Sequence, residues 1–167
     1  MTLELKTLHP EALGRALAKA ERYRLLNEPS EAESICRDVL DVDAANQEAI
    51  ATLILALTEQ FAEHAKLFGE AADLAAQLRD DYERAYYTGI VWERRAKAHL
   101  AHDGPVLGTQ VYDWLHEAMT WFERAEAIRP AGNDDALLRW NACARLIMRD
   151  HRLAPGREEP AEPLLLE

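Results

Sequence analysis

Hydrophobic and polar positions alternate along this chain with the period of an α-helix. In the segment 10–27, apolar or small residues recur every three or four positions, at Leu13, Leu17, Ala20 and Tyr23. Residues at this spacing lie on one face of a helix. The segment is therefore predicted to form one amphipathic helix.

Six further segments have the same period and are bounded by residues that start or stop helices. The segment 49–57 is apolar almost all round, which is typical of a helix packed on several sides. No segment alternates convincingly with the period of two that a half-buried strand requires. The sequence therefore predicts an all-α protein, whose later helices begin near Pro29, Asn46, Leu67, Asp81, Thr109 or Asp113, and Asp134.

One domain is expected to hold all of these helices. A chain of 167 residues is long enough for one well-filled core and short for two. After Arg152, three prolines and mostly charged residues leave little apolar surface to bury. We therefore expect a single helical domain over residues 1–152 and a flexible tail over 153–167.

One arrangement of residues recurs in three of the predicted helices. A small residue is followed by a bulkier one four positions on, another small one seven positions on and a helix-ending residue twelve positions on. Small residues let two helices approach closely, a bulky one fills the gap to a neighbour, and proline ends a helix. The fullest copy is Ala118, Phe122, Ala125 and Pro130, the second is Ala32, Cys36, Val39 and Ala44, and the weakest is Ala71, Ala75 and Leu78.

This arrangement resembles the second helix of a tetratricopeptide repeat (TPR), the unit of a family of α-solenoids. The resemblance covers residues 11–149 and implies a right-handed stack of about three antiparallel helical hairpins plus a C-terminal capping helix. The first-helix half of the repeat is matched more loosely, with Gly89 and Trp92 in its small and aromatic positions. The copies also lie further apart than the usual period of about 34 residues. An ordinary helical bundle remains the alternative.

The resemblance also implies a binding surface, because such stacks hold partners in a concave groove built from their first helices. An apolar floor with an acidic rim suits a protein or peptide that is amphipathic or basic. The carboxylate clamp of chaperone-binding members is not expected, since Leu17 and Glu21 stand where lysine and asparagine are needed. The predicted partner-binding residues are Leu17, Glu21, Arg24, Glu48, Ala51, Leu55, Glu59, Tyr86, Ile90, Glu93 and Arg94.

The charge balance narrows the class of partner. Asp and Glu number 30 against 19 Lys and Arg, which gives a formal net charge of -11. Such a field repels phosphates, so neither nucleic acid nor a membrane surface is expected as a partner, although the charge equally serves solubility. The N-terminus lacks a leader pattern, and the apolar segment 49–57 is too short to span a bilayer. A soluble, cytoplasmic protein is expected.

Few residues have the spacing that metal binding or catalysis requires. His99 and His102 stand near Asp103, and Asp113 stands three residues before His116, but neither group has the further ligands of a zinc or di-iron site. The chain has no phosphate loop, nucleophile elbow or zinc-protease motif. We therefore expect no metal, no cofactor and no catalytic residue.

These features favour a non-enzymatic adaptor or scaffold that binds its partner in the groove. Cys36 and Cys143 stand alone in helical surroundings and are expected to be small buried residues. Two alternatives remain open. One is a helical small-ligand-binding protein or enzyme with a pocket inside the stack, and the other is a homo-oligomer subunit such as a homodimer.

Overall fold

Seven α-helices make up the computed structural model, which describes residues 2–102, 105 and 107–156. No strand occurs within these residues, so the predicted all-α class is confirmed. A short 3-10 turn, η1 (Pro10–Ala12), leads into the first helix. The helices are α1 (Leu13–Leu25), α2 (Pro29–Val42), α3 (Gln47–Thr58), α4 (Leu67–Ala76), α5 (Asp81–Leu100), α6 (Gly108–Ala127) and α7 (Asp135–Arg149).

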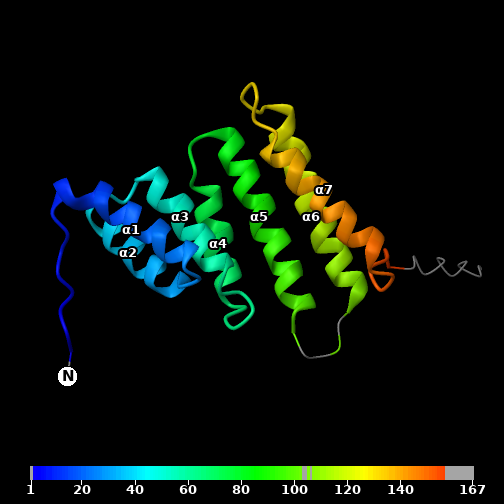
Figure 1. The fold of residues 1–167 in the computed structure, drawn as a ribbon, viewed down its shortest axis with the longest axis horizontal. Coiled ribbons are helices and arrows are strands. Elements are labelled where there is room, and N and C mark those ends of the chain that lie inside the picture. The colour runs from blue at the N-terminus through cyan, green and yellow to red at the C-terminus, as the bar shows by residue number, and fades with distance from the viewer. Residues whose placement is uncertain (1, 103–104, 106, 157–167) are drawn as a thin grey trace, which may run out of the picture.

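The helices stack side by side in chain order along the long axis of the molecule (Figure 1). Each helix packs against the next one in the chain. Contacts between α1 and α3 and between α3 and α5 place these odd-numbered helices in one layer. Side-chain contacts between α5 and α7 extend this layer. Helices α2, α4 and α6 each pack against two members of that layer. The observed packing is thus a two-layered helical stack.

Several helix ends are set by single residues. The side chain of Asn46 accepts a hydrogen bond of 2.9 Å from the backbone N–H of Ala49 and so caps α3. Asp80 caps α5 in the same way, accepting from the backbone N–H of Glu83 at 2.8 Å. Asn27, with φ of 60°, makes the tight turn between α1 and α2 in the left-handed region that asparagine tolerates.

The core falls into two clusters. The first lies between α1, α2, α3 and α4, and α3 is buried on most of its circumference there, as its apolar segment predicts. The second lies between α5, α6 and α7 around Phe122. The recurring small and bulky positions are all at the centre of these clusters, with at most 1% of their surface exposed: Ala32, Cys36, Val39, Ala71, Ala75, Leu78, Ala118, Phe122 and Ala125.

Gly89 brings α5 unusually close to α6. A Cβ atom built on Gly89 would lie 2.5 Å from Cε1 and 2.7 Å from Cδ1 of Phe122, which is closer than carbon atoms pack. The ring of Phe122 therefore occupies the space that a side chain at position 89 would need. Gly89 thus has the small packing role that the sequence predicts for it.

Leu153, the first residue of the predicted tail, packs against the helical domain. Leu153 is only 5% exposed and packs into the second core cluster, because the turn after α7 brings the chain back to the start of α6. A Cβ atom on Gly108 would collide with the carbonyl oxygen of Arg152, so the two segments are in close contact. Residues 154–156 are exposed, and the rest of the predicted tail, 157–167, lies outside the described residues.

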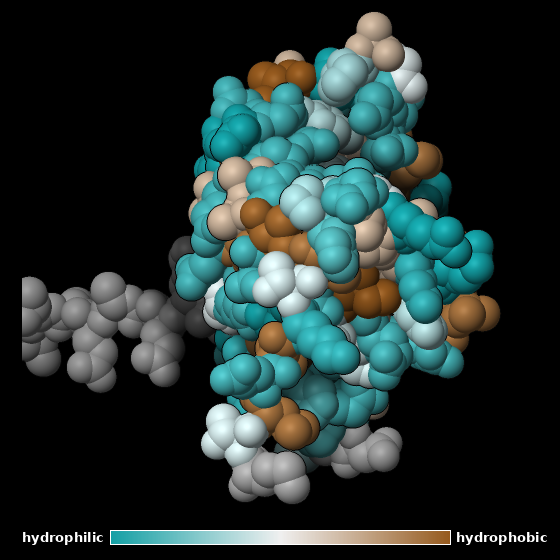
Figure 2. Space-filling model, turned by 90° about the vertical axis from the view of Figure 1, so that its left-hand side faces the viewer, coloured by the Kyte–Doolittle hydropathy of each residue, from teal (hydrophilic) through white to brown (hydrophobic). Residues whose placement is uncertain are grey.

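The end of the stack formed by α1 and α2 has a mixed surface. Hydrophobic residues appear there as separate patches among hydrophilic ones (Figure 2). A second copy stacking on this end would need a broader apolar face than the one in view. The end face therefore gives no support to the homo-oligomer alternative.

Candidate functional site

A hollow of about 380 Å³ lies between α1, α3 and α5, on the layer of odd-numbered helices. Five of the predicted partner-binding residues line it: Glu21, Arg24, Glu48, Ala51 and Leu55. Four further lining residues are absent from the prediction: Gln47, Thr52, Glu83 and Tyr87. The nine residues together are called the α1–α3–α5 groove below.

The periodicity of α3 explains how the floor of this groove forms. Glu48, Ala51 and Leu55 recur at helical spacing on the one stripe of α3 that the core covers only in part. Ala51 has the short side chain of the three, so the surface dips at its position. Leu55 and the aromatic ring of Tyr87 supply apolar surface beside the dip, and both are half-buried.

The rim of the groove is negatively charged. Glu21, Glu48 and Glu83 contribute three carboxylates. Within the part of the chain that the structure describes, neither Glu48 nor Glu83 forms an ion pair. Arg24, the one cation among the described lining residues, is already paired with two carboxylates. The groove therefore presents a net negative field to solvent.

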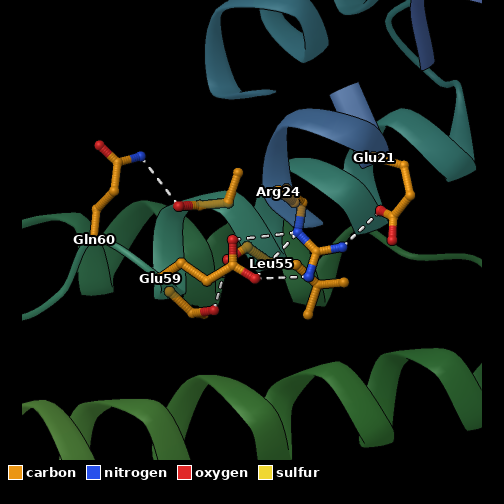
Figure 3. A network of polar contacts seen from close by, with 7 residues as sticks. Glu21, Arg24, Leu55, Glu59 and Gln60 are labelled. Carbon is orange, nitrogen blue, oxygen red and sulfur yellow. Dashed lines mark hydrogen bonds and ion pairs between the residues drawn. The ribbon is translucent and has the colours of Figure 1, made fainter. Parts of the chain in front are cut away.

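Arg24 ties α1 to the end of α3 (Figure 3). Its Nη2 donates to Oε1 of Glu59 at 2.7 Å, its Nε donates to the same oxygen at 3.2 Å, and its Nη1 donates to Glu21 at 2.7 Å. Burial opposes the charge of Arg24, but hydrogen bonds and attraction from Glu59, and more weakly from Glu21, outweigh it and raise the pKa of the guanidinium. The predicted groove residue Glu59 thus holds Arg24 in place and does not line the hollow.

Two predicted groove residues are wrong because they belong to the core. Leu17 is 4% exposed and packs in the first cluster, and Ile90 is 1% exposed and packs in the second. Ile90 follows Gly89 directly on α5, and its side chain packs into the cluster that α5, α6 and α7 share.

Glu93 is also wrong as a groove residue, since its side chain is 1% exposed. Its carboxylate accepts a hydrogen bond of 2.9 Å from Nη1 of Arg139 on α7 and forms a second ion pair with Lys97. Nε of Arg139 donates in turn to the hydroxyl of Tyr86 at 3.1 Å. Helix α7 therefore packs against Tyr86 and Glu93. Neither of these residues lines the groove, and the half-buried Arg94 does not line it either.

A signal for this arrangement was present in the sequence. Lys97 stands four residues after Glu93, which is the spacing of a helical ion pair. Placing the capping helix beside α5 in the layer of first helices would have assigned Glu93 to a contact between these two helices. The hydrophobic periodicity of the sequence does not show where α7 packs relative to α5.

The two cysteines are buried, as predicted. Burial raises the pKa of each thiol, Cys36 and Cys143, to about 12. Thiols with such a pKa are poor nucleophiles at neutral pH. Among the described residues, no group of three or more His, Cys, Asp or Glu is placed to hold a metal ion.

Comparison with protein-family models, curated proteins and solved structures finds no match for this chain. The resemblance to tetratricopeptide repeats therefore rests on the residues given above. None of the helices in the described part of the chain is both long enough and apolar enough to cross a membrane.

Proposed function

We propose that this chain is a TPR-like scaffold that binds a basic, amphipathic peptide in the α1–α3–α5 groove. The observation that carries the proposal is the combination of three rim carboxylates with an apolar floor and no free cation among the described lining residues. Such a surface attracts lysine and arginine and offers desolvated contact to an apolar anchor.

The dip at Ala51 is the anchor position in this proposal. A leucine- or methionine-sized side chain of the peptide lies over Ala51, against Leu55 and Tyr87. Basic residues on either side of the anchor approach Glu48 and Glu83. The partly buried pair of Arg24 and Glu59 supports the groove from one side, so little ordering of the scaffold accompanies binding.

The layered packing supports the TPR part of the proposal. Helices α2, α4 and α6, with Leu78 just after α4, carry the recurring small and bulky residues, and these are buried where neighbouring helices meet. In the proposed right-handed stack, α1–α2, α3–α4 and α5–α6 are the three hairpins and α7 is the terminal cap. The groove then lies on the concave layer of first helices, where binding requires no catalytic group.

Selection of random peptides displayed on phage tests the proposal without a known partner. Enriched sequences are expected to carry several lysines or arginines around one apolar residue. The tightest peptide, labelled with fluorescein, is then titrated by fluorescence anisotropy against the triple variant Glu21→Gln, Glu48→Gln, Glu83→Gln. Affinity is expected to fall about tenfold or more, most strongly at low salt.

A charge-matched control separates the groove from the overall acidity of the protein. Glu31, Asp41 and Asp73 are exposed residues of α2 and α4 that form no ion pair among the described residues. The amide variants of these three residues remove the same charge and are expected to bind normally. Equal weakening in both triple variants would show a non-specific charge effect, and enrichment of acidic peptides would contradict the proposal outright.

A further inference from the structure

A second hollow lies at the other end of the odd-numbered helices and shares no residue with the α1–α3–α5 groove. It has a volume of about 240 Å³ and is lined by the connection between α3 and α4, by α4, by the C-terminal part of α5 and by α6. Figure 1 shows that connection and the end of α5 at the same lower edge of the stack. The lining residues used below are Phe61, Phe68, Arg95, His99, His102 and Trp114.

Arg95 is held between two aromatic rings in this hollow. Its guanidinium carbon lies 4.0 Å from the ring centroid of Phe68 on α4 and 4.2 Å from that of Trp114 on α6. Rings on both sides of a guanidinium fix its plane and leave its edge, which carries the N–H donors, for a ligand. The rings come from helices on either side of α5, so the stack itself positions the arginine.

The donors of Arg95 have no acceptor within the described residues. No hydrogen bond or ion pair of Arg95 is formed there, whereas Arg24, Arg37 and Arg139 are each bound to carboxylates. Burial without a neighbouring acid lowers the pKa of Arg95 from its ordinary value. A partly buried guanidinium that lies between two rings and lacks an acceptor gains from a bound anion.

Two histidines extend the polar side of the hollow. His99 follows Arg95 by four residues on α5, so the two lie on one stripe of the helix, and His102 lines the hollow from the turn just after α5. The ring of His99 packs edge-on against Trp114 with 5.4 Å between centroids, which restrains its orientation. Imidazole N–H groups can donate to the same anion as the guanidinium.

The rest of the hollow is apolar. Phe61 and Phe68 lie with their ring centroids 6.2 Å apart, and three alanines complete the wall: Ala62, Ala65 and Ala98. An apolar wall with a few converging polar groups is the usual composition of a small-ligand pocket. Its volume suits a compact body of about ten non-hydrogen atoms, given that drug-sized pockets begin at about 300 Å³.

We propose that this hollow binds an apolar carboxylate, with the acid group on the edge of Arg95 and the apolar body against Phe61 and Phe68. The carboxylate accepts two parallel hydrogen bonds from the guanidinium, as its geometry favours. The same chemistry is available from a free arylalkyl acid and from the C-terminal residue of a peptide. Because the net charge of the chain is -11, short-range contacts and not long-range attraction must supply the affinity.

Calorimetric titration with 4-phenylbutyrate and with 4-phenylbutyramide tests the proposal on the whole chain. The acid is expected to bind about tenfold tighter than the amide or more, since a hydrogen bond to a charged group contributes well above that of a neutral one. In Arg95→Gln the ratio of the affinity for the acid to the affinity for the amide is expected to fall to about one. Arg124→Gln is the matched control, because Arg124 also lies on a ring, 4.4 Å from Trp121, but outside the hollow.

A second comparison distinguishes the two sources of the carboxylate. A hexapeptide ending in phenylalanine is titrated with a free C-terminus and as its amide. Binding of the free peptide at least about tenfold tighter than 4-phenylbutyrate indicates a peptide terminus, whereas weaker binding indicates a free acid. Either result supports the proposed chemistry.

Folding of the variants is checked by thermal melting followed by circular dichroism. If Arg95→Gln does not fold, Arg95→Lys replaces it in the titration. This variant keeps the charge but loses the paired donors, so its preference for the acid over the amide is expected to be weaker than that of the unaltered chain. Equal binding of acid and amide by the unaltered protein, no binding of either, or an undiminished preference in a folded Arg95 variant would each overturn the proposal.

Discussion

Nη1 of Arg139 lies 2.9 Å from a carboxylate oxygen of Glu93, although the two residues are 46 positions apart in the chain. The pair joins the last helix, α7, to α5 and buries a carboxylate that is only 1% exposed. This pair is why Glu93 belongs to the contact between α5 and α7 and does not line the α1–α3–α5 groove.

Removing Arg139 is expected to destabilise the fold. Arg139→Met leaves the buried carboxylate of Glu93 with Lys97 alone, and breaking a buried pair from one side costs on the order of 3 kcal/mol. The double variant Glu93→Met, Arg139→Met is expected to recover most of this loss, because no unpaired charge is then buried. Urea unfolding of the single and double variants measures both values, and additive losses would show that the two side chains do not interact.

Gly89→Ala is expected to destabilise the chain by about 1–3 kcal/mol, because the new Cβ atom overlaps the ring of Phe122. The control is Gly69→Ala on α4, where a Cβ atom would meet no heavy atom within 4 Å. That change is expected to stabilise the helix by about 0.5–1 kcal/mol. Opposite shifts in melting temperature confirm the close contact of α5 and α6, and equal shifts contradict it.

Leu153→Ala is expected to lower the free energy of unfolding by about 2–3 kcal/mol, because this buried side chain packs in the second core cluster. Leu138 on α7 is 62% exposed, so Leu138→Ala is expected to change stability by less than about 0.5 kcal/mol. Chemical denaturation compares the two. Similar, small losses would mean that the domain does end at residue 152.

Alkaline pH is expected to destabilise the chain through its two thiols. Folding raises the pKa of Cys36 and Cys143 from 9.0 to about 12, so the unfolded chain loses these protons first. Stability from this source is complete below pH 9 and is lost as the pH rises towards 12. The double variant Cys36→Ala, Cys143→Ala should therefore lose less unfolding free energy over this range than the unaltered chain. An identical loss in both proteins would show that the thiols ionise equally well when folded.

Sequence patterns predicted the helices of this fold and the buried residues where neighbouring helices pack. The small and bulky residues recur at helical spacing because each helix buries one face. That face is therefore visible as a pattern in the local sequence. For the same reason Ala51 and Leu55, which the core covers only in part, were predicted to belong to one surface. Of the two predicted starts of α6, Thr109 lies one residue and Asp113 five residues from the observed start at Gly108.

Hydrophobic periodicity does not predict the contacts between helices that are far apart in the sequence. Glu93 was placed in the groove because nothing local shows that α7 packs against α5. The hollow around Arg95 was missed for the same reason, since Phe68 and Trp114 meet it from two other helices. Cys143 and Leu153 both contribute to the second core cluster, but only the folded chain shows that they belong to the same cluster.

The most direct measurement of the central proposal is a nuclear magnetic resonance titration of the nitrogen-15-labelled chain with the tightest selected basic peptide. The proposal predicts that the backbone signals of Glu48, Ala51, Leu55 and Tyr87 shift most and saturate together. Signals of the exposed faces of α2 and α4 should stay unchanged. Shifts concentrated on those faces, with the α1–α3–α5 groove unaffected, would contradict the proposed function.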